Sequence, residues 1–253
     1  MNRDLTRGPV TKGMLLFALP MILGNLLQQM YNTADSIIVG QSVGSNALAA
    51  VSASTSLINL LITFSQGASV GAGVIVSQYL GARDREGVHS SVHTALAIAA
   101  ILGLALTGAG IALSRQLLIW MQTPDEVMPD AVLYLRIYAG ALLFNVMYNM
   151  LAGILNAVGN SKRSLIYLAA AAVTNIVLDL VLVCLFDMGV AGAAIATDMS
   201  QMASCVLALR FLIKVPASYR VSLEKIRICT PDAVRIILVA LPTPIQNMVI
   251  SFY

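Results

Sequence analysis

Long apolar stretches, separated by short polar segments, follow one another along the whole chain. A helix needs about 20 mostly apolar residues to cross a bilayer. Six stretches reach that length, at residues 14–39, 48–78, 89–113, 130–158, 165–186 and 189–213. A seventh begins near Ala233 and is still apolar at Tyr253. The pattern predicts an all-α polytopic membrane protein. Because a helix that stops inside lipid leaves its last carbonyl groups unpaired, we expect the sequence to be the N-terminal part of a longer protein.

Composition and motifs exclude several other classes of protein. Apolar residues make up 58% of the 253-residue chain and charged residues only 11%, whereas soluble domains contain about 25% charged residues. The net charge of +3 is too small for a nucleic-acid binder. The three cysteines form no CxxC pair, and the sequence contains neither GxSxG nor HExxH. We therefore expect no enzyme, no cofactor and no nucleic-acid partner.

Basic residues are divided unequally between the two ends of the predicted helices. If the N-terminus is cytoplasmic, 13 of the 15 Lys and Arg residues lie on the cytoplasmic side, and only Arg115 and Arg136 lie outside. Cytoplasmic loops of membrane proteins carry such an excess of Lys and Arg. The distribution, together with the short loops, predicts a multi-pass protein of the cell (inner) membrane with a cytoplasmic N-terminus.

Two sequence windows, one near each end of the chain, resemble each other. They begin at Pro9 and Pro231 and have several identical residues in register, including Pro20 with Pro242. Six helices separate them, so both windows enter the membrane from the same side, as in transporters built from two parallel six-helix halves. We expect one lobe of a 12-helix, two-lobe pseudo-symmetric transporter. Its predicted regions are an N-terminal six-helix lobe (1–213), a cytoplasmic inter-lobe linker (214–232) and the start of transmembrane helix 7 (233–253).

Three carboxylic acids lie within the predicted spans, at Asp35, Asp179 and Asp198. A charge at the centre of a bilayer costs about 2.5–3.5 kcal/mol on insertion scales. Since no Lys or Arg lies deep in a span, the acids must face a hydrated cavity, bind a cation or be protonated. Each possibility favours transport. Asp198 follows Thr197 and points about 100° away from it, so it faces either the cavity or a neighbouring helix.

Polar residues also form faces on five of the predicted helices. On the first helix, Asn25, Gln28, Asn32 and Asp35 share one face. Isolated polar residues often serve only as interhelical contacts, but five such faces favour a shared hydrated cavity. The remaining faces consist of Ser52, Ser56, Asn59, Thr63 and Gln66; Asn145 and Asn149; Asn175 and Asp179; and Thr197 and Gln201.

Five segments of the sequence resemble the multidrug and toxic compound extrusion (MATE) family of transporters. They are ALPMILGNLLQQMYNTADSIIVG, SQYLGARD, GILNAVGNSK, TNIVLD and GVAGAAIATDMSQ. The resemblance covers essentially the whole chain. It implies a 12-helix antiporter with a V-shaped cleft between two lobes, which expels bulky, often cationic compounds in exchange for H⁺ or Na⁺. Neither the coupling ion nor the substrate follows from the sequence.

The resemblance also assigns roles to individual residues. It implies a cation-coupling set of Asp35, Asn175, Asp179, Thr197 and the backbone carbonyl of Ala193, in which Asp35, Asn175, Asp179 and Thr197 could hold Na⁺. The expected substrate cavity contains Gln28, Tyr31, Asn32, Asn149 and Asp198, although Asp198 has no counterpart in the family pattern. Pro20 matches the family's bending proline, and its kink is either static or a hinge.

Other functions remain open at this level. A lipid-linked oligosaccharide flippase of the same superfamily is the nearest alternative, but it would need a basic cleft for a diphosphate. An ion channel, a membrane enzyme and an assembly of two short chains fit the pattern less well. The expected partners are the bilayer and small, cationic organic substrates, and we expect a monomer once a second lobe is present.

Overall fold

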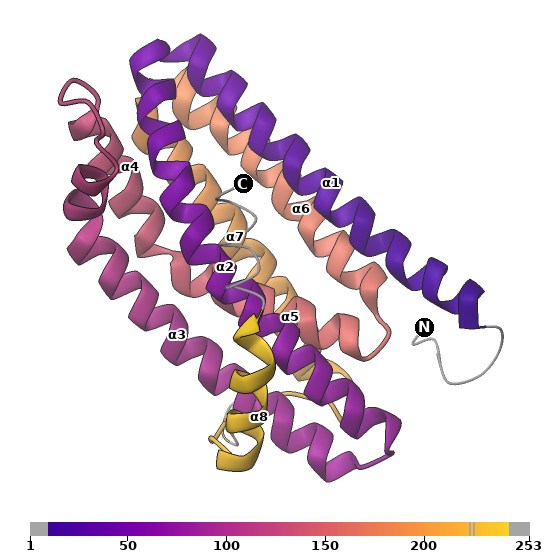
Figure 1. Cartoon of the computed structure of the whole chain (residues 1–253). Coiled ribbons are helices and arrows are strands. Elements are labelled where there is room, and N and C mark those ends of the chain that lie inside the picture. The colour runs from indigo at the N-terminus through magenta and orange to yellow at the C-terminus, as the bar shows by residue number, and fades with distance from the viewer. Residues whose placement is uncertain (1–9, 223, 225, 243–253) are drawn as a thin grey trace.

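The computed structural model of the protein describes residues 10–222, 224 and 226–242. Over this part of the chain the regular elements are helices (Figure 1), which confirms the predicted all-α fold. In chain order they are α1 (Val10–Ser42), α2 (Ser45–Gly81), α3 (Arg85–Trp120), α4 (Met128–Gly140), α5 (Leu142–Ala157), α6 (Ser161–Asp179), the π-helix η1 (Leu180–Leu185), α7 (Gly189–Lys214) and α8 (Thr230–Ala240).

Each of the six predicted spans is helical. Among the described residues, α2, α3, α7 and the continuous segment Ser161–Leu185 are long and apolar enough to cross a membrane. The pair α4 and α5 makes a fifth, bent span. α1 has 33 residues and is therefore also long enough to cross a membrane. Over its described residues, however, it is not among the helices that are both long and apolar enough to do so.

The fourth predicted span, residues 130–158, is not one straight helix. It is divided at Ala141 into α4 and α5, which are bent by 49° relative to each other. The backbone N–H of Ala141 donates to the carbonyl of Tyr138 at 3.2 Å, and that of Phe144 donates to Ala141 at 2.9 Å. These three-residue bonds replace the regular helical ladder directly after Gly140, whose missing side chain weakens a helix. The bend was not predicted.

The fifth span changes its helix type at its end. Directly after Asp179 the chain continues as the six-residue π-helix η1, and the N–H of Phe186 donates to the carbonyl of Val181, five residues earlier, at 2.9 Å. Such short π segments are often found at functional sites. Here the wider turn follows one of the three acids within the membrane.

α7 is the central helix of the bundle. More than half of its most apolar window, 56%, is buried, compared with 28% for α3. It packs against α4, α5 and α6, while α1 packs mainly along α6. Two hydrophobic clusters result, one that joins α2, α3, α5 and the second half of α7, and one that joins α2, α4 and the first half of α7. Outside these clusters, large apolar side chains remain exposed on the outer faces, as contact with lipid requires.

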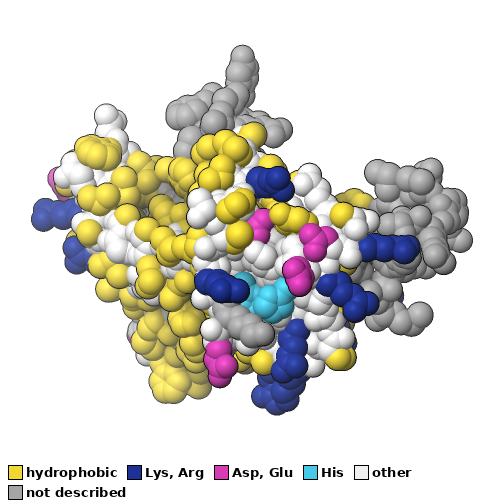
Figure 2. Space-filling model, turned by 90° about the horizontal axis from the view of Figure 1, so that it is seen from below, with side chains coloured by type: hydrophobic (Ala, Val, Ile, Leu, Met, Phe, Trp, Pro, Cys, Tyr) yellow, Lys and Arg dark blue, Asp and Glu magenta, His cyan; other side chains and the backbone are white. Residues whose placement is uncertain are grey.

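The two ends of the bundle differ in charge. The turns α2–α3 and α5–α6 lie at the same end as α8, and the turns α1–α2 and α3–α4 lie at the opposite end (Figure 1). We call the first of these the basic end, because it includes Arg83, Arg85, Lys162, Arg163 and Lys214. Figure 2, which looks from below, shows Lys and Arg side chains around the two histidines. The helices therefore divide the basic residues as the sequence predicted.

The segment after α7 is attached to the basic end of the bundle. Asp232, in the first turn of α8, accepts hydrogen bonds from the hydroxyls of Tyr79 (2.8 Å) and Ser90 (2.7 Å). The imidazole of His93 accepts the backbone N–H of Ser222 at 3.0 Å. Residues 243–253, with about half of the second repeat window and of the predicted helix 7, lie outside the described residues.

Candidate functional site

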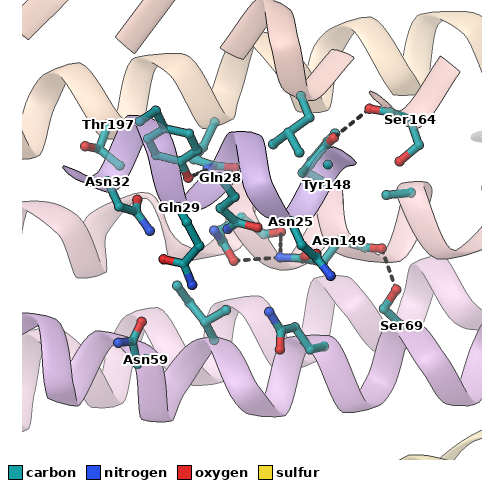
Figure 3. Close-up of a pocket in the computed structure, with 18 of the residues that line it drawn as sticks. Asn25, Gln28, Gln29, Asn32, Asn59, Ser69, Tyr148, Asn149, Ser164 and Thr197 are labelled. Carbon is teal, nitrogen blue, oxygen red and sulfur yellow. Dashed lines mark hydrogen bonds between the residues drawn. The ribbon is translucent and has the colours of Figure 1, made fainter. Parts of the chain in front are cut away.

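A cavity of about 740 Å³ lies between α1 and α2 and reaches residues of α4, α5, α6 and α7. Figure 3 shows side chains from several of these helices pointing toward one another across it, among them Asn32, Asn59 and Asn149. All four residues of the polar face predicted for the first helix line it, and so do Tyr31 and Thr197. The faces of the first, fourth and sixth predicted helices therefore meet in one space, as their spacing predicted. Of the face on the second helix only Asn59 and Gln66 line the cavity, and the pair Asn175 and Asp179 does not line it.

Neutral polar side chains dominate the wall of this cavity. Among the described residues it carries ten carboxamides and four tyrosines, with Asp35 as its only acid and no Lys or Arg. The carboxamides are Asn25, Gln28, Gln29, Asn32, Asn59, Gln66, Asn145, Asn149, Asn156 and Gln201. Such a wall offers many donors and acceptors, together with aromatic faces and a single site of negative charge.

Hydrogen bonds hold part of this wall in place. The hydroxyl of Ser69 in α2 donates to the carbonyl of Asn149 in α5 at 2.6 Å, where Gly153 lets the two helices approach each other closely. The amide of Asn149 in turn donates to the side-chain oxygen of Asn145 at 2.9 Å. The hydroxyl of Tyr148 donates to the carbonyl of Ser164 in α6 at 3.2 Å. These bonds, drawn in Figure 3, join α2, α5 and α6 around the cavity.

A second group of polar residues lies behind Thr197. The amide nitrogen of Asn175 donates to the Thr197 hydroxyl at 3.3 Å, and this hydroxyl donates to the carbonyl of Ala193 at 3.1 Å. Asn175 and Asp179 are completely buried and do not line the cavity. The charges of Asp35 and Asp179 are close enough to interact. The structure thus brings together all five residues of the expected cation-coupling set, whose role stays a prediction.

This second group has more acceptor atoms than donors. Over the described residues, buried oxygens of Asp35, Asn175 and Asp179 have no hydrogen-bond partner, and for Asp179 this applies to both carboxyl oxygens. An unpaired buried polar atom is costly. A proton or a Na⁺ ion would satisfy these atoms, because hard cations prefer carboxylate, amide and hydroxyl oxygens. The residues present therefore fit either ion.

Asp198 does not belong to the cavity wall, contrary to its assignment to the substrate cavity. It is half-buried and is absent from the residues that line the cavity. Because Asp198 lies outside the wall, of the two directions open to it the structure favours a neighbouring helix. The reason is geometric, because Thr197 occupies the face of α7 toward the cavity and the next residue is turned about 100° away.

Three tyrosines that the sequence analysis did not select, Tyr134, Tyr138 and Tyr148, form part of the wall. Tyr134 and Tyr138 lie one turn apart in α4, and their rings stack with centroids 6.4 Å apart. Tyr138 and Asn145 are spaced so that both would lie on one face of a straight helix. The signal was present in the sequence, but the bend between α4 and α5 means that spacing alone does not decide which residues meet.

Pro20 lies inside α1, is buried and lines the cavity. α1 continues on both sides of it as one helix. Because proline has no backbone N–H, the helical ladder lacks one bond at this position. The position fits a hinge next to the cavity, and the hinge role stays a prediction.

Comparison of the sequence with known proteins gives consistent matches. The family model MatE matches residues 20–181. The chain is 35% identical over 211 residues to the probable multidrug resistance protein YpnP of Bacillus subtilis, covering 83% of this chain and 47% of that protein. It is 27% identical to the multidrug export protein MepA of Staphylococcus aureus, covering 82% of this chain and 46% of MepA.

Solved structures with the same fold cover nearly the whole chain. A MATE transporter in a bent conformation gives a TM-score of 0.92 at 27% identity, covering 98% of this chain and 56% of its own. An outward-facing multidrug resistance MATE transporter also gives 0.92, covering 98% of this chain and 55% of its own. An inward-facing multidrug resistance MATE transporter gives a TM-score of 0.80 at 28% identity. The match covers 86% of this chain and 49% of that transporter's chain. The chain thus spans about half the length of the proteins it matches.

Proposed function

Because the chain belongs to the MatE family of multidrug and toxic compound extrusion transporters, we propose that it forms one lobe of an exporter of organic compounds. The proposed exchange is with H⁺ or Na⁺, by alternating access. The observation that carries this proposal is the acceptor-rich group around Asp179, directly behind a polar cavity that contains Asp35. The export of drugs is supported by the similarity to YpnP and MepA.

The wall of the cavity supports a class of substrate. A cation gains from the single acid, Asp35, and meets no Lys or Arg on this wall. Four tyrosines offer faces to flat apolar or cationic groups, and ten carboxamides accept or donate hydrogen bonds in many orientations. Bulky organic cations of varied shape are the proposed substrates, and the second lobe would complete their site.

Coupling follows from competition for the same negative charge. A cation bound by Asp35 and Asp179 neutralises the acid that attracts the substrate, so that each ligand weakens the binding of the other. A coupling free energy of about 1–3 kcal/mol corresponds to a 5–150-fold change in affinity, which is enough to release a drug. A change in the bend of α1 at Pro20 would reduce the cavity volume at the same time, and the lobes would then reopen on the inner side.

The proposed location is the cell (inner) membrane, with the N-terminus and the basic end in the cytoplasm. The excess of Lys and Arg at that end supports this orientation. The cavity would then open outward, in agreement with the similarity to an outward-facing transporter.

A lipid-linked oligosaccharide flippase is the second candidate. A diphosphate needs basic side chains, and the described part of this wall has none. One of the similar structures is a transporter from Pyrococcus furiosus, described as having a binding pocket of reversed polarity and a different function. Pocket polarity therefore varies within this fold, and the wall found here, mostly neutral with one acid and no base among the described residues, favours organic cations.

Proteoliposomes that contain the protein and a fluorescent cationic dye test the proposal. A pH gradient and a Na⁺ gradient are imposed in separate experiments, and wild type is compared with Asp35→Asn. Asp125→Asn is the matched control, because Asp125 is exposed and does not line the cavity. We expect one gradient to drive dye movement, Asp35→Asn to abolish it and Asp125→Asn to leave it unchanged.

Two results would contradict the proposal in different ways. Dye movement that persists in Asp35→Asn would exclude Asp35 from coupling. Absence of dye movement under both gradients in the wild type would contradict the export of organic cations and favour the flippase.

A further inference from the structure

A second, smaller cavity lies at the basic end of the bundle, where α6 begins and α7 ends. It has a volume of about 330 Å³. Its wall includes Asn160, Arg163, Phe211, Lys214 and Tyr219. We propose that this cavity, here called the basic pocket, binds the phosphate of an anionic phospholipid headgroup. The inference does not depend on the proposed transport function, since it concerns another site and another ligand.

Arg163 is held in place before any ligand binds. Its guanidinium lies over the ring of Phe211, 4.0 Å from the ring centroid. This cation–π contact fixes the plane of the guanidinium and leaves its N–H donors at the edge for an acceptor. A planar fork of donors matches the oxygens of a phosphate group. Lys214, the last residue of α7, adds a second positive charge to the same wall.

The charge at the start of α6 is unbalanced. The N-terminus of a helix carries a partial positive charge and favours an acidic residue, but the first turn of α6 contains no acid. It contains Lys162 and Arg163 instead. Asn160, 6% exposed, precedes the helix, and its side chain does not cap it. Two cations thus meet at a helix N-terminus, where an anion would be stabilised.

The two helices that form the pocket carry no acid near it. No Asp or Glu lies between Asp130 and Asp179, or between Asp198 and Glu224. Asp179 is at the opposite end of α6 from Arg163, and Asp198 is in the opposite half of α7 from Lys214. At about 1.5 Å per residue, these acids are roughly 24 Å away from the two cations along their helices. They are too distant to neutralise the pocket, so a bound anion would meet little competition.

The surroundings favour a lipid as the source of the phosphate. On the side of the pocket toward the middle of the bundle, α6 exposes Ile166 (60%) and α7 exposes Leu207 (41%). Acyl chains can lie along these apolar residues while the headgroup reaches the basic residues at the helix ends. Basic pockets between transmembrane helices are suited to anionic headgroups. A free phosphate ion would use the same polar groups but would gain nothing from Ile166 and Leu207.

The test measures lipid binding to the purified protein in an uncharged detergent. Native mass spectrometry counts bound dihexanoyl-phosphatidylglycerol, with dihexanoyl-phosphatidylcholine and inorganic phosphate as the other two ligands. The double variant Arg163→Gln, Lys214→Gln removes both cations of the pocket. The double variant Arg83→Gln, Arg85→Gln removes the same charge from exposed residues of the basic end that do not line the pocket. Phe211→Leu keeps all charges and removes the ring under Arg163.

We expect phosphatidylglycerol to bind the wild type more tightly than the other two ligands. Each cation near a membrane surface contributes an attraction that corresponds to about a fivefold change in affinity. The pocket double variant should therefore bind about 30-fold more weakly, and Phe211→Leu several-fold more weakly. The control double variant should keep most of the affinity.

Three outcomes would overturn the proposal. Equal losses in both double variants would indicate diffuse surface charge instead of a pocket. Equal binding of phosphatidylcholine would indicate that the phosphate charge is not recognised. Inorganic phosphate that binds as tightly as phosphatidylglycerol would identify the pocket as a site for free phosphate.

Discussion

At the scale of single residues, Asp179 is the least satisfied side chain of the candidate site. It has no exposed surface, and neither carboxyl oxygen has a partner among the described residues. Asp35 is mostly buried as well, and its charge acts on Asp179. Such residues stabilise a fold poorly. Their presence is better explained by a function that needs a cation at this position.

Asp179→Asn should therefore affect stability and transport in opposite directions. An amide of the same size removes the buried acid, so we expect the thermal midpoint to rise by about 2–4 °C, the change that corresponds to about 1 kcal/mol in a chain of this size. Gradient-driven efflux should disappear. Thermal unfolding in detergent and the dye assay measure the two effects.

Asp125→Asn is the control for this prediction, since Asp125 is exposed and a surface substitution changes stability by less than about 0.5 kcal/mol. A marked fall in the midpoint of Asp179→Asn would show that the carboxylate is held by partners in the native protein.

At the scale of helices, two kinds of contact help to hold α8 against the rest of the bundle. The first is steric. A Cβ atom at Gly71 in α2 would meet the carbonyl oxygen of Ile236 and the backbone nitrogen of Ala240, the latter at 3.0 Å. The second is polar and involves the buried Asp232 with Tyr79 and Ser90. Together they hold the segment after α7 against α2 and α3.

Gly71→Ala should destabilise the protein by about 1–3 kcal/mol, because an added methyl group must displace the backbone of α8. Gly108→Ala is the matched control, since Gly108 is also inside a helix but no atom lies within 4 Å of its added Cβ. There the better helix propensity of alanine should stabilise by roughly 0.5–1 kcal/mol. Equal changes in the two thermal midpoints would contradict the close packing of α2 and α8.

Asp232→Ala should loosen the segment between α7 and α8. Hydrogen bonds to a charged group contribute about 1.5–3 kcal/mol, and here two hydroxyls donate to one carboxylate. We expect faster tryptic cleavage after Arg220 and Arg227, measured by mass spectrometry of the fragments. Tyr79→Phe removes only one of the two bonds, so its effect should be smaller. Cleavage at the wild-type rate in Asp232→Ala would show that other contacts hold this segment.

At the scale of the whole molecule, polar faces that are far apart in the sequence meet in one cavity. α1 supplies many of the amides, α4 and α5 supply tyrosines and asparagines, and α7 supplies Thr197 and Gln201. The chain resembles an outward-facing transporter with a TM-score of 0.92 and an inward-facing one with 0.80. If the basic end is cytoplasmic, as proposed, an outward-facing state should make the cavity accessible from the opposite end.

A cysteine at Asn32 tests this orientation. In a background without the three native cysteines, Asn32→Cys should react with a membrane-impermeant maleimide added outside sealed cells, because Asn32 is exposed and lines the cavity. An excess of the exported cation should slow the reaction. Ala208→Cys is the control that should stay unlabelled, since Ala208 is completely buried. Labelling of Asn32→Cys only from inside would reverse the orientation.

Much of this architecture could be predicted from the sequence, because lipid imposes a simple condition. Every backbone polar group inside a bilayer must be paired within the protein, so a long apolar stretch is a helix. The six predicted spans are therefore found at nearly their predicted positions. The polar face of the first helix was predictable for a related reason, since α1 is regular enough for residues three and four apart to share a side.

The positions of Asp198, Tyr134 and Tyr138 could not be predicted with the same rule. A helical period gives the angle between two residues on one helix, but it does not say which neighbour each angle faces. The break at Ala141, the π-helix after Asp179 and the close approach of Gly71 to α8 are all irregular or long-range features. They depend on packing between segments that are distant in the sequence.

The sequence by itself determined the helices, the division of charge between their ends and the presence of acids within the membrane, because the bilayer acts on each segment separately. Only the tertiary structure decided which of these acids share a site. It placed Asp35 within electrostatic reach of Asp179, kept Asp198 out of the cavity wall and brought Arg163 and Lys214 into one pocket. The physical reason is that a carboxylate or guanidinium acquires its role from the partners that packing places around it.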